Sequence, residues 1–417
     1  MGQANLSTLD GIAKDDYLDV IVEMTNNRTW VLDKVKREAA AVTGQGRRTV
    51  FSVESRPNRS FQAGTDGGTL AQTDSAQYDD GILTLSYFNG GMEMTQIAMA
   101  VMKGSGVQGS MDAFKLQMRS LQQQLKNHIC RVIYSDNSGA LTVCGTTTAS
   151  LTVTVSTTQY IEVGMLVDIA ATATGTPVTN GTARTVISVN HAAGTFVIDT
   201  GGGTVTTSSS HAVYMSESYG NEFDGLRFIA STSREIYGID SATPGNEYFN
   251  GKIRDVGASA AAPEVAGPRP FQQLANSIGK TGQAEVGVFV TTRGVQDRLA
   301  LTYESQKRFE ATRPVELHGG YEAIYVNKIP VIYDDDCPLG FAFALPKNIN
   351  ETFTWKQTGD PDWLKSEDGQ IFNLKNSTTA GRKVGAWQAW IEWNAALGCI
   401  SPQRVGQLRY MQDDDPE

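Results

Sequence analysis

The sequence has few of the residues that build metal centres and disulfide frameworks. Its 417 residues include only four cysteines and four histidines. The cysteines form no C-x-x-C pair and the histidines stand far apart, so the spacing favours neither a zinc site nor a set of disulfides. We therefore expect no metal and no cofactor. The residues concerned are Cys130, Cys144, Cys337, Cys399, His128, His191, His211 and His318.

Long apolar runs and an excess of positive charge are also missing. No stretch of about 18 apolar residues occurs, and the N-terminal MGQANLSTLDGIAKDDYLD lacks the apolar centre of a signal peptide. We expect a chain without a membrane segment that is cytosolic where it is made. The formal net charge is -10, whereas proteins that grip nucleic acid concentrate lysine and arginine. A general nucleic-acid binder is therefore not expected.

Motifs of catalysis are scarce, and the chain is not expected to be an enzyme. No G-x-S-x-G occurs, and the histidines have no partner pattern. The three aspartates at 334–336 could bind a cation, but consecutive carboxylates are more typical of a solvated turn. Trp387, Trp390 and Trp393 could form a carbohydrate platform. On an alternating strand, however, Trp387 and Trp393 share one face, which favours a place in the core.

A glycine motif precedes the longest helical pattern. The glycines of KGSGVQGS, which begins at Lys103, follow the G-x-G-x-x-G order of dinucleotide-binding loops. That reading needs a strand before the glycines, but residues 92–103 favour a short helix. It also needs an acidic residue about 20 positions on, and Asp136 comes too late. We interpret the glycines as a joint before one long helix from about Met111 to Tyr134, with Ser110 as its N-cap.

Two segments stand out as additions to a host domain. Residues 47–89 predict a long hairpin with a polar, glycine-rich middle, which has little on which to bury its tip. Such a hairpin makes sense if it contacts another protein molecule. After Asn137 the composition shifts to Thr, Val, Gly and Ser, and Arg184 is the only Lys or Arg up to Glu217. This stretch predicts an inserted all-β module of five to seven strands on an exposed loop of the host.

The remainder of the chain predicts an α+β fold. The first 45 residues predict one short amphipathic helix, which suggests an N-terminal arm and not a domain. Beyond the β module, a helix from Pro270, a buried strand (EVGVFV) and a second helix are followed by a hairpin that turns at Asn327-Lys328. GAWQAWIEWNAALGCISP near the C-terminus predicts a long strand.

This order of elements resembles the major capsid proteins of tailed double-stranded DNA bacteriophages. Their Hong-Kong-97-type fold is shared with bacterial encapsulins. The string YVNKIPVIYDDDCPLGFAFALPKNI and the later GCISP carry the local resemblance, which is sharpest from Gly320 to Lys347. The resemblance implies an N-terminal arm at 1–45, an extended hairpin loop at 46–93, a peripheral domain with a spine helix at 94–137, an inserted all-β domain at 138–220, an axial domain at 221–346, and a return through axial and peripheral domains at 347–417.

The function implied is that of a capsid subunit. Such a subunit forms hexamers and pentamers of an icosahedral shell that encloses double-stranded DNA in the virion, after assembly in the bacterial cytoplasm. Scaffolding, portal and decoration proteins would be its partners. Two alternatives are an encapsulin-like compartment and a secreted adhesin or glycan-binding protein. The missing signal peptide counts against the adhesin, and the β insertion favours phage over encapsulin.

Four arginines are candidates for contacts between subunits: Arg47, Arg48, Arg56 and Arg59. Solvation is an equally open interpretation of Arg56 and Arg59. The hairpin contains no lysine, so the lysine–asparagine cross-link of some family members has no donor there. The N-terminus also shows no pattern of the long helical pro-domain that some family members use as an internal scaffold. We therefore expect a non-covalent shell that assembles on a separate scaffolding protein or on none.

Overall fold

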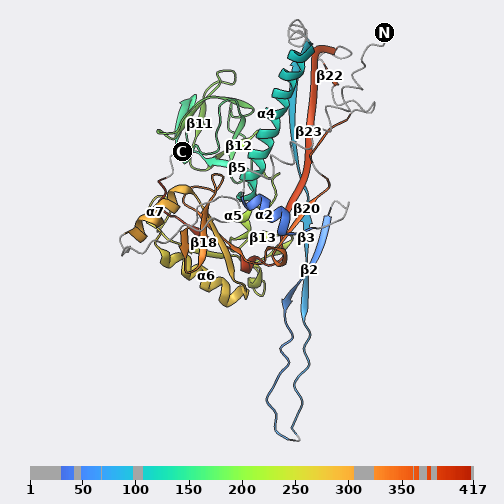
Figure 1. Ribbon diagram of the computed structural model, residues 1–417, viewed down its shortest axis with the longest axis vertical. Coiled ribbons are helices and arrows are strands. Elements are labelled where there is room, and N and C mark those ends of the chain that lie inside the picture. Colours follow the sequence, from blue (N-terminus) through green and yellow to red (C-terminus); the bar gives the residue numbers. More distant parts are fainter. Residues whose placement is uncertain are drawn as a thin grey trace.

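A computed structural model of the chain describes residues 30–41, 48–66, 68–96, 107–304, 324–359, 361–365, 373–376 and 383–414. A long hairpin projects from a body in which a long helix lies along two long strands (Figure 1). Two further β structures occupy the other side of this helix. One is the compact module at residues 140–215 and the other is a sheet covered by helices.

The first sheet is built around the C-terminal tryptophan strand, β23 (Lys383–Cys399). Strands β4 and β21 pair with the same residues of β23, Ile391 and Glu392, so they lie on its opposite edges. Trp393 is buried in the core as expected, whereas Trp387 and Trp390 are only partly buried. The other members of this sheet are β1 (Ala40–Ala41), β4 (Ser86–Thr95), β20 (Phe353–Gln357), β21 (Asp362–Trp363) and β22 (Asn373–Asn376).

The long helix α4 (Val107–Ile133) packs along one face of β4 (Figure 1). A glycine allows close approach at Gly90, where a Cβ would lie 3.0 Å from Leu121 Cδ1. The predicted spine helix is present, but it already includes Val107, so Ser110 lies inside the helix and is not its N-cap. Gly109 is helical too, while Gly104 and Gly106 lie outside the described residues.

The prediction of a short helix at residues 92–103 is wrong for Met92 to Thr95. Met92 to Thr95 end strand β4 instead, and Met94 is buried opposite Trp387 of β23. The spacing of apolar residues there suits a helix, but pairing with a strand almost 300 residues away decides the structure. A sequence pattern in one short window carries no signal of such a distant partner.

The predicted hairpin is confirmed as β2 (Arg48–Arg56) and β3 (Gln77–Thr84). Its base is anchored to the body. The Phe51 ring lies across Gly81, where a Cβ would come within 2.5 Å of it, and it meets the Tyr237 ring edge-on at 5.6 Å. The Tyr248 hydroxyl donates a 2.7 Å hydrogen bond to Asp79 Oδ2. Beyond the paired strands, residues 57–66 and 68–76 form a tip that extends away from the body (Figure 1).

Residues 140–215 form the predicted all-β module, with one strand more than the expected maximum. An antiparallel sheet in the order β5-β12-β8-β9-β10-β7 is accompanied by the pair β11-β6. The module has its own apolar cluster around Val153, Val167 and Phe196. Its strands are β5 (Ala140–Val143), β6 (Thr147–Ser150), β7 (Thr152–Thr154), β8 (Leu166–Ala171), β9 (Arg184–Asn190), β10 (Thr195–Ile198), β11 (Val205–Thr207) and β12 (His211–Met215).

Arg184, the single basic residue of the module, ties two of its loops together. Its side chain is 3% exposed. Nε donates to Asp199 Oδ1 at 2.9 Å, and Nη1 donates to the carbonyl oxygens of Asn180 at 2.6 Å and Gly203 at 2.8 Å. Nη2 donates to the Asp199 carbonyl. A planar guanidinium can serve this many acceptors at once, which lysine cannot.

We expect Arg184→Met to destabilise the module by about 3 kcal/mol, because it leaves several acceptors without their donor. Limited proteolysis and hydrogen exchange should show faster opening of residues 140–215 with the rest of the subunit unchanged. Lys347→Met is a suitable control, since that lysine is 69% exposed in its ion pair with Glu285 and should cost less than about 1 kcal/mol. An equally small cost for both variants would contradict the role given to Arg184.

The third sheet and its helices form a separate core around Phe271 and Phe289, whose rings meet edge-on at 5.1 Å. The predicted turn is confirmed, with positive φ at Asn327 (50°) and Lys328 (70°), the geometry of a two-residue hairpin. The sheet contains β15 (Lys252–Asp255), β24 (Gly406–Arg409), β19 (Ala342–Pro346), β16 (Val286–Thr291), β18 (Ile329–Tyr333) and β17 (Ile324–Val326), with α6 (Pro268–Gly282) and α7 (Arg293–Glu304) beside it.

Short elements complete the body. The helix of the expected arm is described from Trp30, and it buries Val31, Leu32 and Val35 in the largest core cluster. No helix of the described residues is long and apolar enough to cross a membrane. The short elements are α2 (Trp30–Glu38), α5 (Leu226–Ile229), β13 (Glu235–Ile236), β14 (Ile239–Asp240) and the 3-10 turns Glu247–Phe249, Ile349–Glu351 and Pro402–Arg404.

Candidate interaction surfaces

The hairpin tip exposes large apolar side chains at the end of an arm. Phe61 is 85% exposed and Leu70 is 94% exposed. The hydrogen bonds of the tip stay within the hairpin: Asn58 donates to the Asp74 carbonyl at 2.8 Å, and Gln62 donates to the Thr69 carbonyl at 2.5 Å. Single exposed apolar residues are common on proteins. Two of them on an arm without a core of its own indicate a contact with another molecule.

The candidate arginines fall at different places. Arg56 Nη2 lies 2.6 Å from both carboxylate oxygens of Asp74, and this hydrogen bond holds the pKa of Asp74 below its usual value. Arg59 is exposed in the tip and forms no ion pair within the described part of the chain. Arg48 is exposed at the base, and Arg47 lies outside the described residues. Of the four, Arg59 is the one best placed to reach a second molecule.

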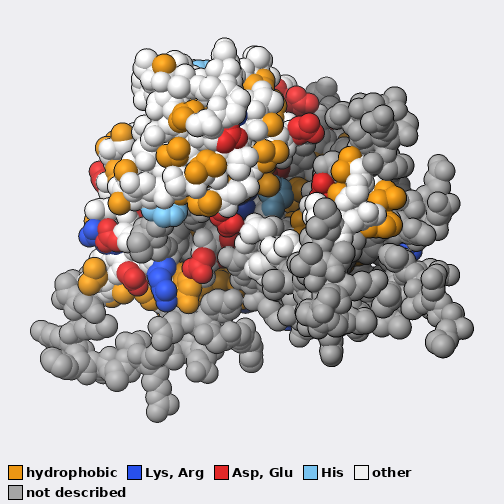
Figure 2. All heavy atoms as spheres, turned by 90° about the horizontal axis from the view of Figure 1, so that it is seen from above, with side chains coloured by type: hydrophobic (Ala, Val, Ile, Leu, Met, Phe, Trp, Pro, Cys, Tyr) orange, Lys and Arg blue, Asp and Glu red, His pale blue; other side chains and the backbone are white. Residues whose placement is uncertain are grey.

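The module surface offers little charge. Seen from above, that face of the molecule carries mostly uncharged side chains with scattered apolar ones (Figure 2). Val163 is 65% exposed and Ile187 is 54% exposed. The only Lys or Arg of the module, Arg184, is buried. This surface therefore lacks cations that could neutralise phosphates.

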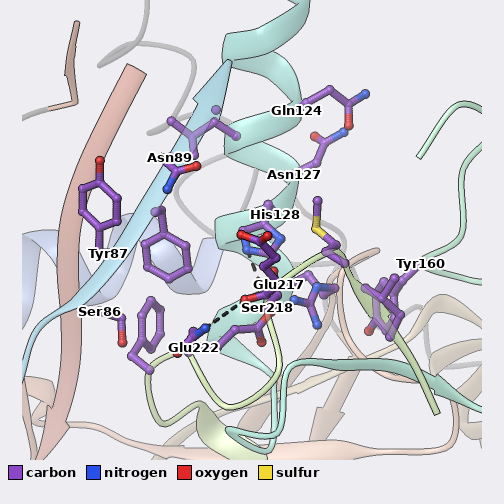
Figure 3. A pocket seen from close by; sticks show the side chains of 18 of the residues that line it. Ser86, Tyr87, Asn89, Gln124, Asn127, His128, Tyr160, Glu217, Ser218 and Glu222 are labelled. Carbon is purple, nitrogen blue, oxygen red and sulfur yellow. Dashed lines mark hydrogen bonds and ion pairs between the residues drawn. The ribbon is translucent and has the colours of Figure 1, made fainter. Parts of the chain in front are cut away.

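A cleft of about 1550 Å³ separates the module from α4 and β4 (Figure 3). One wall is formed by β4 residues 86–91 and by α4 side chains such as Leu121. The module loops at 159–166 and 215–218 form the other wall. Exposed carboxylates at the cleft belong to Glu162, Glu217 and Asp335.

The floor of the cleft holds a buried ion pair. Arg131 Nη2 contacts Glu222 Oε1, and the two side chains are 7% and 2% exposed. His128 Nε2 lies 3.8 Å from the same oxygen (Figure 3). Burial raises the pKa of Glu222 even though Arg131 opposes that shift. Burial, with Arg131 nearby, lowers the pKa of His128 to about 3, so this imidazole is neutral at physiological pH and poorly matched to acid–base catalysis there.

Sequence reasoning did not single out this cluster. Arg131 lies within the apolar stripe of α4, between buried Cys130 and Val132. A charged residue in such a stripe is a weak sign of a buried partner. The partner, Glu222, lies 91 residues further on, beyond the whole module.

Asp334 is buried, so the expectation of a solvated turn is wrong for this residue. It is 6% exposed, and its carboxylate accepts hydrogen bonds from the Tyr134 hydroxyl (2.7 Å) and the Asp336 N–H (3.0 Å). Asp335 beside it is exposed. Burial raises the pKa of Asp334 to about 7, with Asp336 adding to the shift. Within the described residues, no group of three His, Cys, Asp or Glu side chains is placed to hold a metal ion.

The raised pKa of Asp334 predicts a loss of stability as pH rises. The folded state holds a proton that the unfolded state has already released between pH 4 and 7, so the free energy of unfolding should fall by roughly 1 kcal/mol per pH unit there. Asp334→Asn keeps the shape and removes this titration. Chemical denaturation at several pH values should give a flatter dependence for the variant. Parallel curves for the two proteins would contradict the assignment.

Comparison with known proteins places the fold. No protein-family model and no curated protein matches the sequence. The chain is similar to a protein in the capsid asymmetric unit of cyanophage A-1(L), with 12% identity, 92% of this chain and 93% of that chain covered, and a TM-score of 0.54. The Hong-Kong-97-type fold expected from the sequence is thereby confirmed.

Other solved structures give lower scores. The capsid of an empty GTA particle has 9% identity, covers 91% of this chain and 96% of that chain, and has a TM-score of 0.46. The SrpI encapsulin from Synechococcus elongatus has 9% identity, covers 92% of this chain and 89% of that chain, and has a TM-score of 0.42.

Proposed function

We propose that the chain is a major capsid protein that assembles into hexamers and pentamers of an icosahedral shell around double-stranded DNA. The observation that carries the proposal is a fold shared with a cyanophage capsid protein over 92% of this chain and 93% of that one. The projecting hairpin supports it, since its tip has apolar side chains and no core within the subunit. The role is structural, and the location is the virion after assembly in the bacterial host.

The domain division expected from the sequence is part of this proposal. Residues 46–93 act as the extended loop, 94–137 as the peripheral domain with α4, and 221–346 as the axial domain. Residues 138–220 are an insertion, which their own sheet and apolar cluster support. Arg47, Arg48, Arg56 and Arg59 remain candidates for subunit contacts. A scaffolding protein, a portal and a decoration protein are the further partners.

The enclosed DNA is held by confinement. With a net charge of -10, the chain has no overall excess of positive charge that would bind duplex DNA. Packaged DNA must also enter and leave, and a strongly cationic lining would oppose both by binding phosphates. Isolated subunits should accordingly show no salt-dependent affinity for duplex DNA near physiological ionic strength.

Electron microscopy of the purified protein tests the proposal. Closed icosahedral shells built from this chain are expected, and particles from phage-producing cells should contain DNA. Shells that enclose protein cargo and never DNA would favour the encapsulin alternative. A protein that stays monomeric under all assembly conditions would contradict the shell function and favour the adhesin alternative.

A further inference from the structure

The cleft between the module and α4 carries an excess of negative charge. Six carboxylate side chains line it, and Arg131 is the only lysine or arginine among the described residues of its walls. Glu222 balances that arginine. Within the described part of the chain, Glu162, Glu217 and Asp335 are exposed and form no ion pair. The six carboxylates belong to Glu162, Glu217, Glu222, Asp224, Asp335 and Asp336.

The floor of the cleft adds two acceptors without a donor. Glu222 Oε2 and His128 Nδ1 are buried and have no hydrogen-bond partner within the described residues, and both side chains line the cleft (Figure 3). His128 is neutral at physiological pH. A proton on its Nε2, which lies 3.8 Å from Glu222 Oε1, leaves Nδ1 as an acceptor. Arg131 Nε also lacks a partner, but it is a donor of the existing ion pair. The two acceptors suit a cationic donor.

The spacing of the acids indicates which cation fits. No three of the described His, Cys, Asp and Glu side chains are placed to hold one metal ion. The acids of the cleft come instead from three separate segments, at 162, 217–224 and 335–336, and apolar side chains of Leu121, Val163 and Leu166 line the same cleft. A linear polyamine matches this pattern, because its ammonium groups are donors only and are separated by short hydrocarbon chains.

Contacts across the cleft hold its walls in place. Gln124 of α4 donates a 3.2 Å hydrogen bond to Glu162 Oε2 of the module. The Tyr160 hydroxyl of the module donates to the Asp336 carbonyl at 3.0 Å. The site is therefore largely formed before a ligand arrives, which lowers the entropic cost of binding. Its volume of about 1550 Å³ exceeds the roughly 300–1,000 Å³ of most small-molecule pockets, so a bound polyamine would keep part of its water.

We propose that this cleft binds a linear polyamine. Its ammonium groups contact the rim carboxylates of Glu162, Glu217 and Asp335, and one terminal ammonium donates to the acceptors of Glu222 and His128 at the floor. The hydrocarbon segments pack on the apolar part of the wall. The site lies within one subunit, so the inference goes beyond the proposed function and does not depend on assembly.

Calorimetric titration of isolated subunits with spermine at low ionic strength tests the site. Saturable binding is expected. Glu162→Gln combined with Glu217→Gln should weaken it at least about tenfold, because two rim charges are removed. Both positions are exposed, so the variant should fold normally. Glu235→Gln, an exposed acid outside the cleft, is the matched control and should change the affinity by less than about twofold. Absence of saturable binding, or equal affinity of the double variant and the natural protein, would overturn the inference.

Three further titrations separate a built site from general attraction of cations. His128→Phe keeps a ring beside Phe88 but removes an acceptor of the floor, so spermine should bind at least about fivefold more weakly. Unchanged affinity would contradict the place given to the terminal ammonium. Mg²⁺ at the same concentration should not displace spermine, and displacement would reduce the cleft to a diffuse acidic surface. Tighter binding of tetralysine than of spermine would show that the cleft receives a basic peptide instead.

Discussion

Replacing residues 57–76 by the dipeptide Asn-Gly is expected to leave a folded subunit that forms no closed shells. Arg56 and Gln77 are directly paired, so a two-residue turn can join them and end the hairpin at its ladder. The tip contributes no residue to any of the core clusters. Within the subunit its removal deletes only exposed contacts such as the Arg56–Asp74 ion pair, so folding should be spared. Assembly should fail because the contacts of the tip with other copies are lost.

Circular dichroism and thermal unfolding should be close to those of the full chain, and sedimentation together with electron microscopy should show subunits or open capsomers. Phe51→Ala is the contrasting variant at the hairpin base. It removes a ring that packs on Tyr237 and should destabilise the subunit by about 3 kcal/mol. Normal shells from the shortened hairpin would show that the tip is not needed for assembly.

Local patterns predicted those elements whose partners are near in the chain. The hairpin, the turn at Asn327-Lys328 and the apolar stripe of α4 follow from alternation, turn residues and helical spacing. The shift to Thr and Val after Asn137 predicted the β module. The predicted maximum was seven strands, and the module has eight. The resemblance supplied the arrangement of these parts, and the cyanophage structure agrees with it as a fold.

Features that depend on distant pairing were missed. Met92 to Thr95 look helical alone and are a strand because β23 lies beside them. The run of aspartates predicts a solvated Asp334. The residue is buried instead, against Tyr134, which lies 200 residues earlier in the chain. The pairing of Arg131 with Glu222 requires that the chain return to α4 after the module. In each case the deciding contact spans far more sequence than any periodicity covers.

The buried ion pair below the cleft gives the second large effect. Arg131→Met is expected to lower the free energy of unfolding by about 3–5 kcal/mol, because it leaves the Glu222 carboxylate buried without its cation. The pair is imperfectly satisfied even in the native protein, since Glu222 Oε2, Arg131 Nε and His128 Nδ1 find no hydrogen-bond partner among the described residues. In the natural protein His128, 3.8 Å away, is neutral at physiological pH, so Arg131 is the cation that Glu222 depends on.

The same reasoning predicts that removing both charges costs little. In Arg131→Met combined with Glu222→Met, apolar side chains occupy the site of two desolvated ions, and stability should return to within about 1.5 kcal/mol of the natural protein. Arg409→Met, which breaks an ion pair with side chains 28% and 45% exposed, is the surface control and should cost less than about 1 kcal/mol. Denaturant titration of isolated subunits measures all four proteins.

The pH dependence separates an unpaired charge from a simple packing defect. Burial already raises the pKa of Glu222 with Arg131 present, and without the cation it should rise further. Lowering the pH protonates the carboxyl and removes the penalty, so the cost of Arg131→Met should shrink from pH 8 to pH 5. The double variant has no carboxyl at this site and should gain no stability there on acidification. A cost of Arg131→Met that is the same at both pH values would show that the arginine acts through its packing alone.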